Sequence, residues 1–298
     1  MTTLIEPEFL RRLEALKNRL LPGIRRLELP RPNLTGFGIS PEVESHRPYA
    51  PGDDTRYIDW NLYARLDRFY LKSMLREEEG ALHLLIDASE SMRHPSEEKL
   101  ERALQVSAAL AYIMIAAGGK VTHYSWADGI TSYQEHQGQR GQPMVLLHAL
   151  ASSGTGRVTD LHRTLHAFVR MSEAKRARLF IISDFIDLTS FDVDLEYLRS
   201  SEVRTTAVQI LHPQETSLRK RGYLRISDPE TGDSVTQLVG YRALRRAERE
   251  ARRFLNRTAD RFRRLGFPFL RYDLDQSFEE IVTDCLMPDR GASRFDRL

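Results

Sequence analysis

Residues 82 to 91 read Leu-His-Leu-Leu-Ile-Asp-Ala-Ser-Glu-Ser, an apolar strand pattern that runs directly into a polar loop. The loop carries Asp87, Ser89 and Ser91 at alternating positions. At the carboxyl end of a buried parallel strand, this carboxylate and these two hydroxyls can point at one spot, and Mg²⁺ prefers hard oxygen ligands of this kind. Serines after a strand are more often turn or helix-cap residues, so the rest of the chain must decide between the two interpretations.

Two later segments add polar side chains that can meet the same loop. Residues 178 to 184, Arg-Leu-Phe-Ile-Ile-Ser-Asp, form a second apolar run, and it ends at Asp184. Thr159 lies where a glycine-containing loop leads into a helical pattern. In a doubly wound parallel sheet, loops on either side of the point where the strand order reverses meet in one crevice. Thr159 and Asp184 are therefore expected beside Asp87, although a helix N-cap and a turn residue are the ordinary alternatives.

From residue 81 onward, strand and helix patterns alternate, which predicts an α/β fold with a mainly parallel sheet covered on both faces. Strands are predicted near residues 81–87, 119–126, 130–135, 178–183, 203–210 and 267–272. Helices are predicted near residues 97–117, 143–151, 160–172, 191–199, 240–265 and 276–286. Asp128-Gly129 is a hairpin signal, so the strand after it should be antiparallel, and a second hairpin is expected over residues 222–238. Upstream, an amphipathic helix is predicted over residues 8–21 and a turn-rich stretch over 22–56.

The chain resembles a known family at these residues. Asp87-Ala88-Ser89-Glu90-Ser91, Thr159-Asp160 and Ser183-Asp184 are similar to the metal-ion-dependent adhesion site of von Willebrand factor A domains. Residues 47 to 65, which include Pro51-Gly52-Asp53-Asp54, resemble the signature of a bacterial family called domain of unknown function 58. The resemblance implies a von Willebrand factor A-like, Rossmann-type domain over residues 79–290. An N-terminal helix and a family-specific turn-rich segment would occupy residues 1–78.

The resemblance also implies a site and a partner. Ser89, Ser91 and Thr159 would be near ligands of the metal, and Asp87 and Asp184 would hold coordinated waters. Few anionic ligands would then touch the ion, so it would keep much of its positive charge and could accept a carboxylate from another protein. Mg²⁺ is the expected ion, with Mn²⁺ or Ca²⁺ as alternatives. The function implied is a non-enzymatic, metal-dependent protein interaction module, an adaptor or co-chaperone for a MoxR-type AAA+ ATPase that acts on client proteins.

Two other functions are weighed against this one. The first is a Mg²⁺-dependent hydrolase using Asp87, but haloacid-dehalogenase-like phosphatases carry a second aspartate where this chain has Ser89. The second is a nucleic-acid binder, because the predicted helix over residues 240–265 is rich in arginine. The whole chain has a net charge of only +2 and no recognised nucleic-acid module, so a solvated helix face or a surface for an acidic partner is favoured.

Further polar groups are interpreted as structural. His162 and His166 have the i, i+4 spacing of zinc ligands, but no glutamate follows His162 and no third ligand is evident, so zinc is not predicted. Asp53, Asp54 and Asp59 are expected to pair with neighbouring arginines rather than to form a second cation site. Trp60 and Tyr63 are expected to pack the following segment onto the domain.

Composition points to a cytoplasmic protein. With 298 residues and 41% hydrophobic content the chain can bury a sizeable core. One cysteine, Cys285, rules out a disulfide within the chain and favours a reducing compartment. Glu6 and Pro7 stand where a signal peptide needs apolar residues, and the longest apolar stretch, residues 108–119, is too short to span a bilayer.

Overall fold

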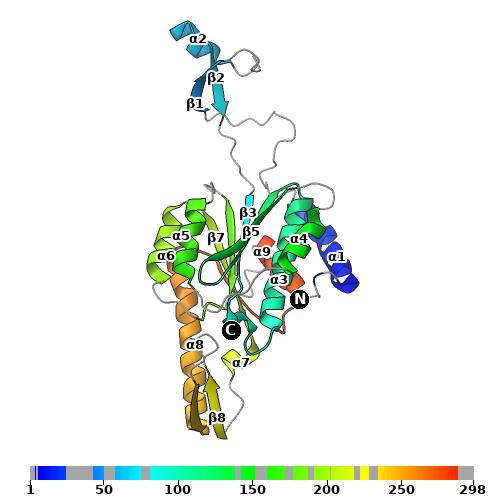
Figure 1. Cartoon of the computed structure of the whole chain (residues 1–298), viewed down its shortest axis with the longest axis vertical. Helices are drawn as coiled ribbons and strands as arrows, with labels where there is room; N and C mark the ends of the chain where they lie inside the picture. Colours follow the sequence, from blue (N-terminus) through cyan, green and yellow to red (C-terminus); the bar gives the residue numbers. More distant parts are fainter. Residues whose placement is uncertain are drawn as a thin grey trace.

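A six-stranded sheet forms the centre of the molecule (Figure 1). The computed structural model describes residues 4, 6–24, 43–49, 58–74, 81–137, 142–151, 160–171, 177–186, 191–201, 203–217, 222–227 and 234–287. The strands are β3 (Ala81–Asp87), β4 (Lys120–Trp126), β5 (Ile130–Gln137), β6 (Arg178–Ser183), β7 (Arg204–Leu211) and β10 (Phe269–Asp273). Their order across the sheet is β10-β7-β6-β3-β4-β5.

The pairing directions make this a Rossmann-type sheet. Every neighbouring pair is parallel except β4 and β5, which are antiparallel as the hairpin signal predicted. The chain runs from β3 outward through β4 to the edge strand β5, and then returns to β6 on the other side of β3. The strand order therefore reverses between β3 and β6, where ligand crevices form in such sheets. The predicted fold class is confirmed.

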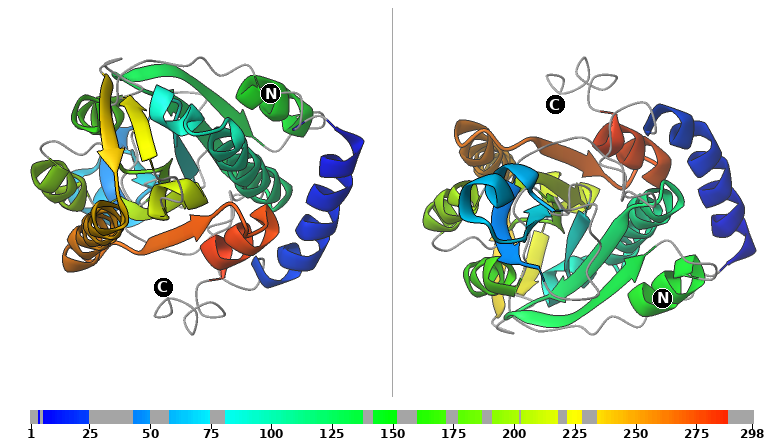
Figure 2. Two further views of the ribbon diagram at one scale, coloured as in Figure 1. Left: turned by 90° about the horizontal axis from the view of Figure 1, so that it is seen from below. Right: turned by 90° about the horizontal axis from the view of Figure 1, so that it is seen from above.

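Helices cover both faces of the sheet because residues along each strand alternate between the faces (Figure 2). Leu82, Leu84 and Ile86 pack on one side, and Ala81 and Leu85 pack on the other. The first side is covered by α1 (Pro7–Ile24), α3 (Glu98–Ala116), α4 (Gln142–Ala151) and α9 (Phe278–Leu286). The second side is covered by α5 (Leu161–Met171), α6 (Phe191–Ser200) and α8 (Tyr241–Arg264).

The N-terminal helix α1 is part of this core. Its buried leucines join the same cluster as α3 and α9, and Phe9 packs against Phe278 with ring centroids 5.1 Å apart. Arg12 donates two hydrogen bonds to the carboxylate of Glu279, at 2.6 and 2.8 Å. The helix thus belongs structurally to the α/β domain, whereas the division of the chain at residue 78 stays a prediction.

A small unit precedes the sheet and was not predicted from the sequence. It consists of β1 (Val43–Pro48), α2 (Trp60–Leu66) and β2 (Tyr70–Met74), with β1 and β2 antiparallel. Asp59 caps α2 by accepting hydrogen bonds from the amides of Asn61 and Leu62. Trp60 contacts Tyr63 and Phe69 by ring edges, Tyr63 stacks on Phe69 with centroids 4.5 Å apart, and Trp60 stays 62% exposed. That these rings pack the segment onto the α/β domain stays a prediction. Asp53 and Asp54 lie outside the described residues.

A hairpin and two short helices lie outside the two helical layers. The predicted second hairpin is formed by β8 (Gly222–Ser227) and β9 (Ser234–Val239), which pair antiparallel. The 3₁₀ helix η3 (Glu90–Arg93) follows β3, and α7 (Pro213–Thr216) follows β7. In the part of the chain that the structure describes, no helix is both long enough and apolar enough to cross a membrane.

Candidate functional site

Two buried carboxylates lie at the point where the strand order reverses. Asp87 is the last residue of β3, and Asp184 directly follows β6. These strands are neighbours, with Ile86 opposite Ile182, so both aspartates are at the same end of the sheet. Asp87 is 0% exposed and Asp184 is 2% exposed. The structure therefore brings together the two strand ends that the sequence indicated.

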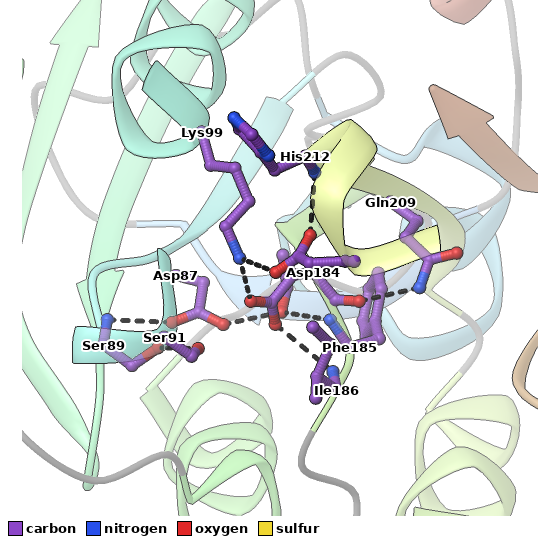
Figure 3. Close-up of polar contacts among 11 residues, drawn as sticks. Asp87, Ser89, Ser91, Lys99, Asp184, Phe185, Ile186, Gln209 and His212 are labelled. Atoms are coloured by element: carbon purple, nitrogen blue, oxygen red, sulfur yellow. Dashed lines mark hydrogen bonds and ion pairs between the residues drawn. The ribbon is translucent and has the colours of Figure 1, made fainter. Parts of the chain in front are cut away.

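Neutral donors from the loop after β3 and from the end of β6 hold the Asp87 carboxylate (Figure 3). Oδ1 accepts a hydrogen bond of 2.9 Å from the Ser89 amide, and Oδ2 accepts one of 2.6 Å from the Ser183 hydroxyl. The turn of η3 brings Ser91 back toward Ser89, and their hydroxyl oxygens lie 3.0 Å apart. Asp87, Ser89 and Ser91 thus form one cluster of oxygens. Ser183, which is part of the resemblance but was given no role at the metal, also belongs to the site through its hydrogen bond to Asp87.

Lys99 is an unexpected component of the site. This residue of α3 is completely buried, and its Nζ lies 2.8 Å from Asp184 Oδ2 and 2.5 Å from Glu215 Oε1 (Figure 3). Burial by itself lowers the pKa of Lys99, but the attraction of the two carboxylates outweighs burial and raises it. The second oxygen of Asp184 accepts a hydrogen bond of 3.2 Å from the Ile186 amide. Asp184 is therefore held by the protein on both oxygens, and its predicted role toward metal-bound waters stays a prediction.

The charges at the site are not balanced by Lys99 alone. One ammonium group can neutralise at most one of the carboxylate charges of Asp87, Asp184 and Glu215. Burial, followed by repulsion from Asp184, raises the pKa of Asp87 to about 7, because the hydrogen bonds from Ser183 and Ser89 compensate only in part. Burial also raises the pKa of Glu215 against the attraction of Lys99. A divalent cation beside Asp87 would supply the missing positive charge.

The oxygen donors fit such a cation. Two neighbouring ligands of an octahedral Mg²⁺, each about 2.1 Å from the ion, are about 3 Å apart. The Ser89 and Ser91 hydroxyl oxygens have this separation, at 3.0 Å. Hydroxyl and carboxylate oxygens are hard ligands, which favour Mg²⁺, Mn²⁺ or Ca²⁺ over softer metals. The residues present can therefore hold the ion that the resemblance implies.

The backbone after β6 is strained at this site. Phe185 has a φ of 50°, a left-handed conformation that is unusual for a bulky residue. It is held there by burial of its ring against Phe262 and Phe269 and by a hydrogen bond of 2.9 Å from its amide to the Ser183 hydroxyl. Gln209 on β7 donates to the Asp184 carbonyl at 2.7 Å. Such strain persists where the surrounding packing fixes it, and it concentrates at functional sites.

Thr159, the remaining predicted ligand, lies outside the described residues, and its role stays a prediction. Its neighbour Asp160 is described and caps α5 by accepting a hydrogen bond of 2.8 Å from the Arg163 amide. The Asp160 amide donates to the carbonyl of Ala127 at 2.7 Å, just after β4. Trp126, the last residue of β4, pairs with Asp87 in the sheet. The start of α5 is therefore anchored to the residue that directly follows β4, beside Asp87.

The arginine-rich helix α8 carries apolar side chains beneath its charged face. Leu244, Leu255 and Phe262 are buried, whereas Phe254 is 39% exposed. Arg245 stacks on Tyr241, and Arg253 bonds Glu250 at 2.8 Å. These buried residues form an apolar face of α8, and the arginines lie on either side of it, as expected for a solvated helix face. That the exposed arginines form a solvated face or a surface for an acidic partner stays a prediction.

The contribution of Asp87 to the unfolding free energy of the metal-free protein is expected to fall as pH rises from about 4 to about 7. The pKa of Asp87 is about 7 in the fold and 3.8 ordinarily, so the folded state binds more protons in this window. That contribution is complete below pH 4 and is lost above pH 7. His83 and His123, whose pKa values burial lowers to about 4, act in the opposite direction. The variant Asp87→Asn keeps the histidines and lacks the titrating carboxyl of Asp87, so its comparison with the wild type isolates the contribution of Asp87 to the unfolding free energy.

The check is urea unfolding with chelator at pH 5 and pH 8. The stability of the wild type relative to Asp87→Asn should be lower at pH 8 than at pH 5. A relative stability that is the same at both pH values would show that the Asp87 carboxyl titrates alike in the folded and unfolded chain.

The sheet topology and the oxygen cluster at the switch point define a von Willebrand factor A-like domain. The sequence matches the model of the family described as "Protein of unknown function DUF58" over residues 45–257, and the chain belongs to this family. An uncharacterized protein of Mycobacterium bovis is 27% identical over 203 residues, which cover 65% of this chain and 62% of the relative. The chain thus matches less than two thirds of that relative's length.

Two solved structures show a distant likeness to this chain. BatB from Bacteroides thetaiotaomicron has 12% identity and a TM-score of 0.42, covering 72% of this chain and 99% of BatB. Proximal thread matrix protein 1 from the mussel byssus, described with a zinc-occupied MIDAS motif, has 12% identity and a TM-score of 0.40. That match covers 69% of this chain and 45% of the mussel chain. With TM-scores this low, the fold assignment depends on the strand order of the chain itself.

Proposed function

We propose that the protein is a metal-dependent protein interaction module whose ion is held by the loop of Asp87, Ser89 and Ser91. The observation that supports this most directly is the pair of hydroxyls 3.0 Å apart beside a buried carboxylate whose pKa is raised. Mg²⁺ suits these oxygens best, with Mn²⁺ or Ca²⁺ as alternatives. Thr159 and Asp184 complete the proposed set, Thr159 as a ligand and Asp184 as the neighbour that orders bound water.

The bound ion would supply a positively charged position that accepts a carboxylate oxygen from another protein. The residues of this chain hold the ion and shape its surroundings. Ser183 and the Ser89 amide fix the orientation of the Asp87 carboxylate. Lys99 keeps the Asp184 carboxylate in place and limits the excess negative charge. The arrangement is therefore suited to binding an acidic side chain of a partner.

The partner we propose is a MoxR-type AAA+ ATPase or its client, with this protein as an adaptor or co-chaperone in the cytoplasm. Two arguments support this proposal. The first is the family resemblance, and the second is that the bound ion would have an open coordination position, which an oxygen from another protein can fill. A hydrolase is less well supported, because the position two residues after Asp87 holds the buried hydroxyl of Ser89 instead of a carboxylic acid. The module is proposed to act by binding and not by catalysis.

Calorimetric titration with Mg²⁺ and with Mn²⁺ tests the metal site. The wild type should bind one ion, and the double variant Ser89→Ala with Ser91→Ala should lose at least about 100-fold in affinity. Two proposed ligands are removed at once, and losing even one residue that orients a ligand typically costs about 10 to 100-fold. Both residues lie in the loop after β3, so the variant should keep its fold. Glu90→Gln is the matched control, since it changes a charge in the same loop without removing a hydroxyl. Equal affinity in the wild type and the double variant would refute the assignment.

A further inference from the structure

Two helices on the other side of the sheet bring three metal-binding side chains together. His162 and His166 lie one turn apart on α5, and Asp194 lies on α6, which packs beside it (Figure 1). His162 Nδ1 is hydrogen-bonded to Asp194 Oδ1, and His166 Nε2 is 4.0 Å from the same oxygen. One potential ligand atom from each residue lies within 4.8 Å of the others. The third ligand that the sequence did not reveal is thus provided by the fold.

The polar atoms of this cluster are incompletely satisfied. Asp194 is 0% exposed, and within the described part of the chain its Oδ2 has no hydrogen-bond partner. The Nε2 atom of His166 is likewise buried and has no hydrogen-bond partner among the described residues. Leaving a carboxylate oxygen buried and unpaired is costly, because it loses its water without gaining a compensating contact. A cation between these atoms would provide that contact.

The ligand types select the class of metal. Imidazole nitrogens with a carboxylate are typical of zinc and neighbouring transition metals, whereas the Asp87 site offers oxygens only. The ring of His166 stacks on Tyr197 with centroids 4.1 Å apart, which restricts its orientation. The side chain of His162 is 50% exposed and leaves a path from solvent. Three protein ligands also leave a fourth tetrahedral position for water or another ligand.

We propose that His162, His166 and Asp194 form a second metal site, which binds Zn²⁺ and joins α5 to α6. The ion would take the place of the hydrogen bond between His162 and Asp194 and would give the unpaired oxygen of Asp194 and the Nε2 atom of His166 a partner. This site uses none of the residues of the Asp87 cluster. Its existence therefore does not depend on the function proposed above.

The test is titration of the full chain, freed of metal, with Zn²⁺ and with Co²⁺ as a spectroscopic probe. We expect Asp87→Asn to bind one Zn²⁺, to bind Co²⁺ with the visible absorption of a histidine-ligated ion, and to gain thermal stability. His162→Ala and His166→Ala in that background should lose at least about tenfold in Zn²⁺ affinity, because removing a ligand should cost no less than the roughly 10 to 100-fold typical of losing a residue that orients one. His94→Ala, which removes an exposed histidine elsewhere, is the control and should bind like its parent.

Folding of each variant is checked by circular dichroism. A substitution at the buried Asp194, such as Asp194→Asn, could prevent folding. His162 is half exposed, so His162→Ala tests the site without that problem. Zn²⁺ binding that is equal in His162→Ala, His166→Ala and their parent would overturn the proposal. So would a failure of folded Asp87→Asn to bind Zn²⁺, which would leave the cluster as a hydrogen-bonded contact between two helices.

Discussion

Replacing Lys99 by methionine is expected to lower the free energy of unfolding by about 3 to 5 kcal/mol, the cost typical of breaking a buried ion pair by removing one partner. The ammonium group is completely buried and contacts Asp184 and Glu215, so its loss leaves two carboxylates in the interior without their cation. Glu215 already has a raised pKa, so protonation of this group will relieve part of the cost. Methionine fills a similar volume, which separates the loss of charge from the creation of a cavity.

Urea unfolding at pH 7 of the wild type, Lys99→Met and Arg253→Met measures this effect. Arg253 forms an ion pair with Glu250 on α8 in which both side chains are more than half exposed. Its replacement should therefore change the unfolding free energy by less than about 1 kcal/mol. If Lys99→Met were no more destabilising than Arg253→Met, the buried ion pair would not hold the ends of α3, β6 and α7 together.

The fold was predictable because its strands are unusually clear in the sequence. Central parallel strands are buried on both faces, so β3 and β6 consist of nearly continuous apolar residues. Asp87 ends β3, and Asp184 directly follows β6. The same property predicted that Asp87 and Asp184 would meet at the switch point. The unit of β1, α2 and β2 was missed because its elements are short and lie within or next to a segment rich in proline and glycine.

The residues that complete the two sites were hidden for a different reason. Lys99 belongs to a run of charged residues at the start of α3, where a solvent-exposed position is the ordinary expectation. Its burial follows from the packing of α3 on the end of the sheet, together with Glu215 from α7, which is 116 residues away. Asp194 is likewise on a different helix from His162 and His166. Spacing along a single helix could not reveal either contact.

Partner binding is expected to depend on the divalent ion and on an acidic side chain of the partner. The ion's open position would accept that side chain, so chelation should release the complex. Asp87→Asn should weaken binding as strongly as chelation, because it removes a buried charge beside the ion. Asp184→Asn should weaken metal binding, and with it the complex, by about 10 to 100-fold, the usual cost of losing a group that orients metal ligands.

An exposed arginine on α8 provides the control for ordinary surface electrostatics. Arg249→Ala should have a smaller effect than Asp184→Asn, and that effect should decrease as salt is added, as expected for a charge at the rim of an interface. Loss of binding on chelation, in contrast, should persist at high salt. The two salt dependences separate a metal-mediated contact from general attraction between charged surfaces.

The most direct measurement is biolayer interferometry of the full chain with a MoxR-type AAA+ ATPase purified with it from its native source. Binding is recorded in Mg²⁺, in chelator, and in Mg²⁺ with Asp87→Asn. The proposed function predicts a complex in the first condition and loss of the complex in the other two. A partner that copurifies and binds equally well in all three conditions would contradict metal-dependent capture.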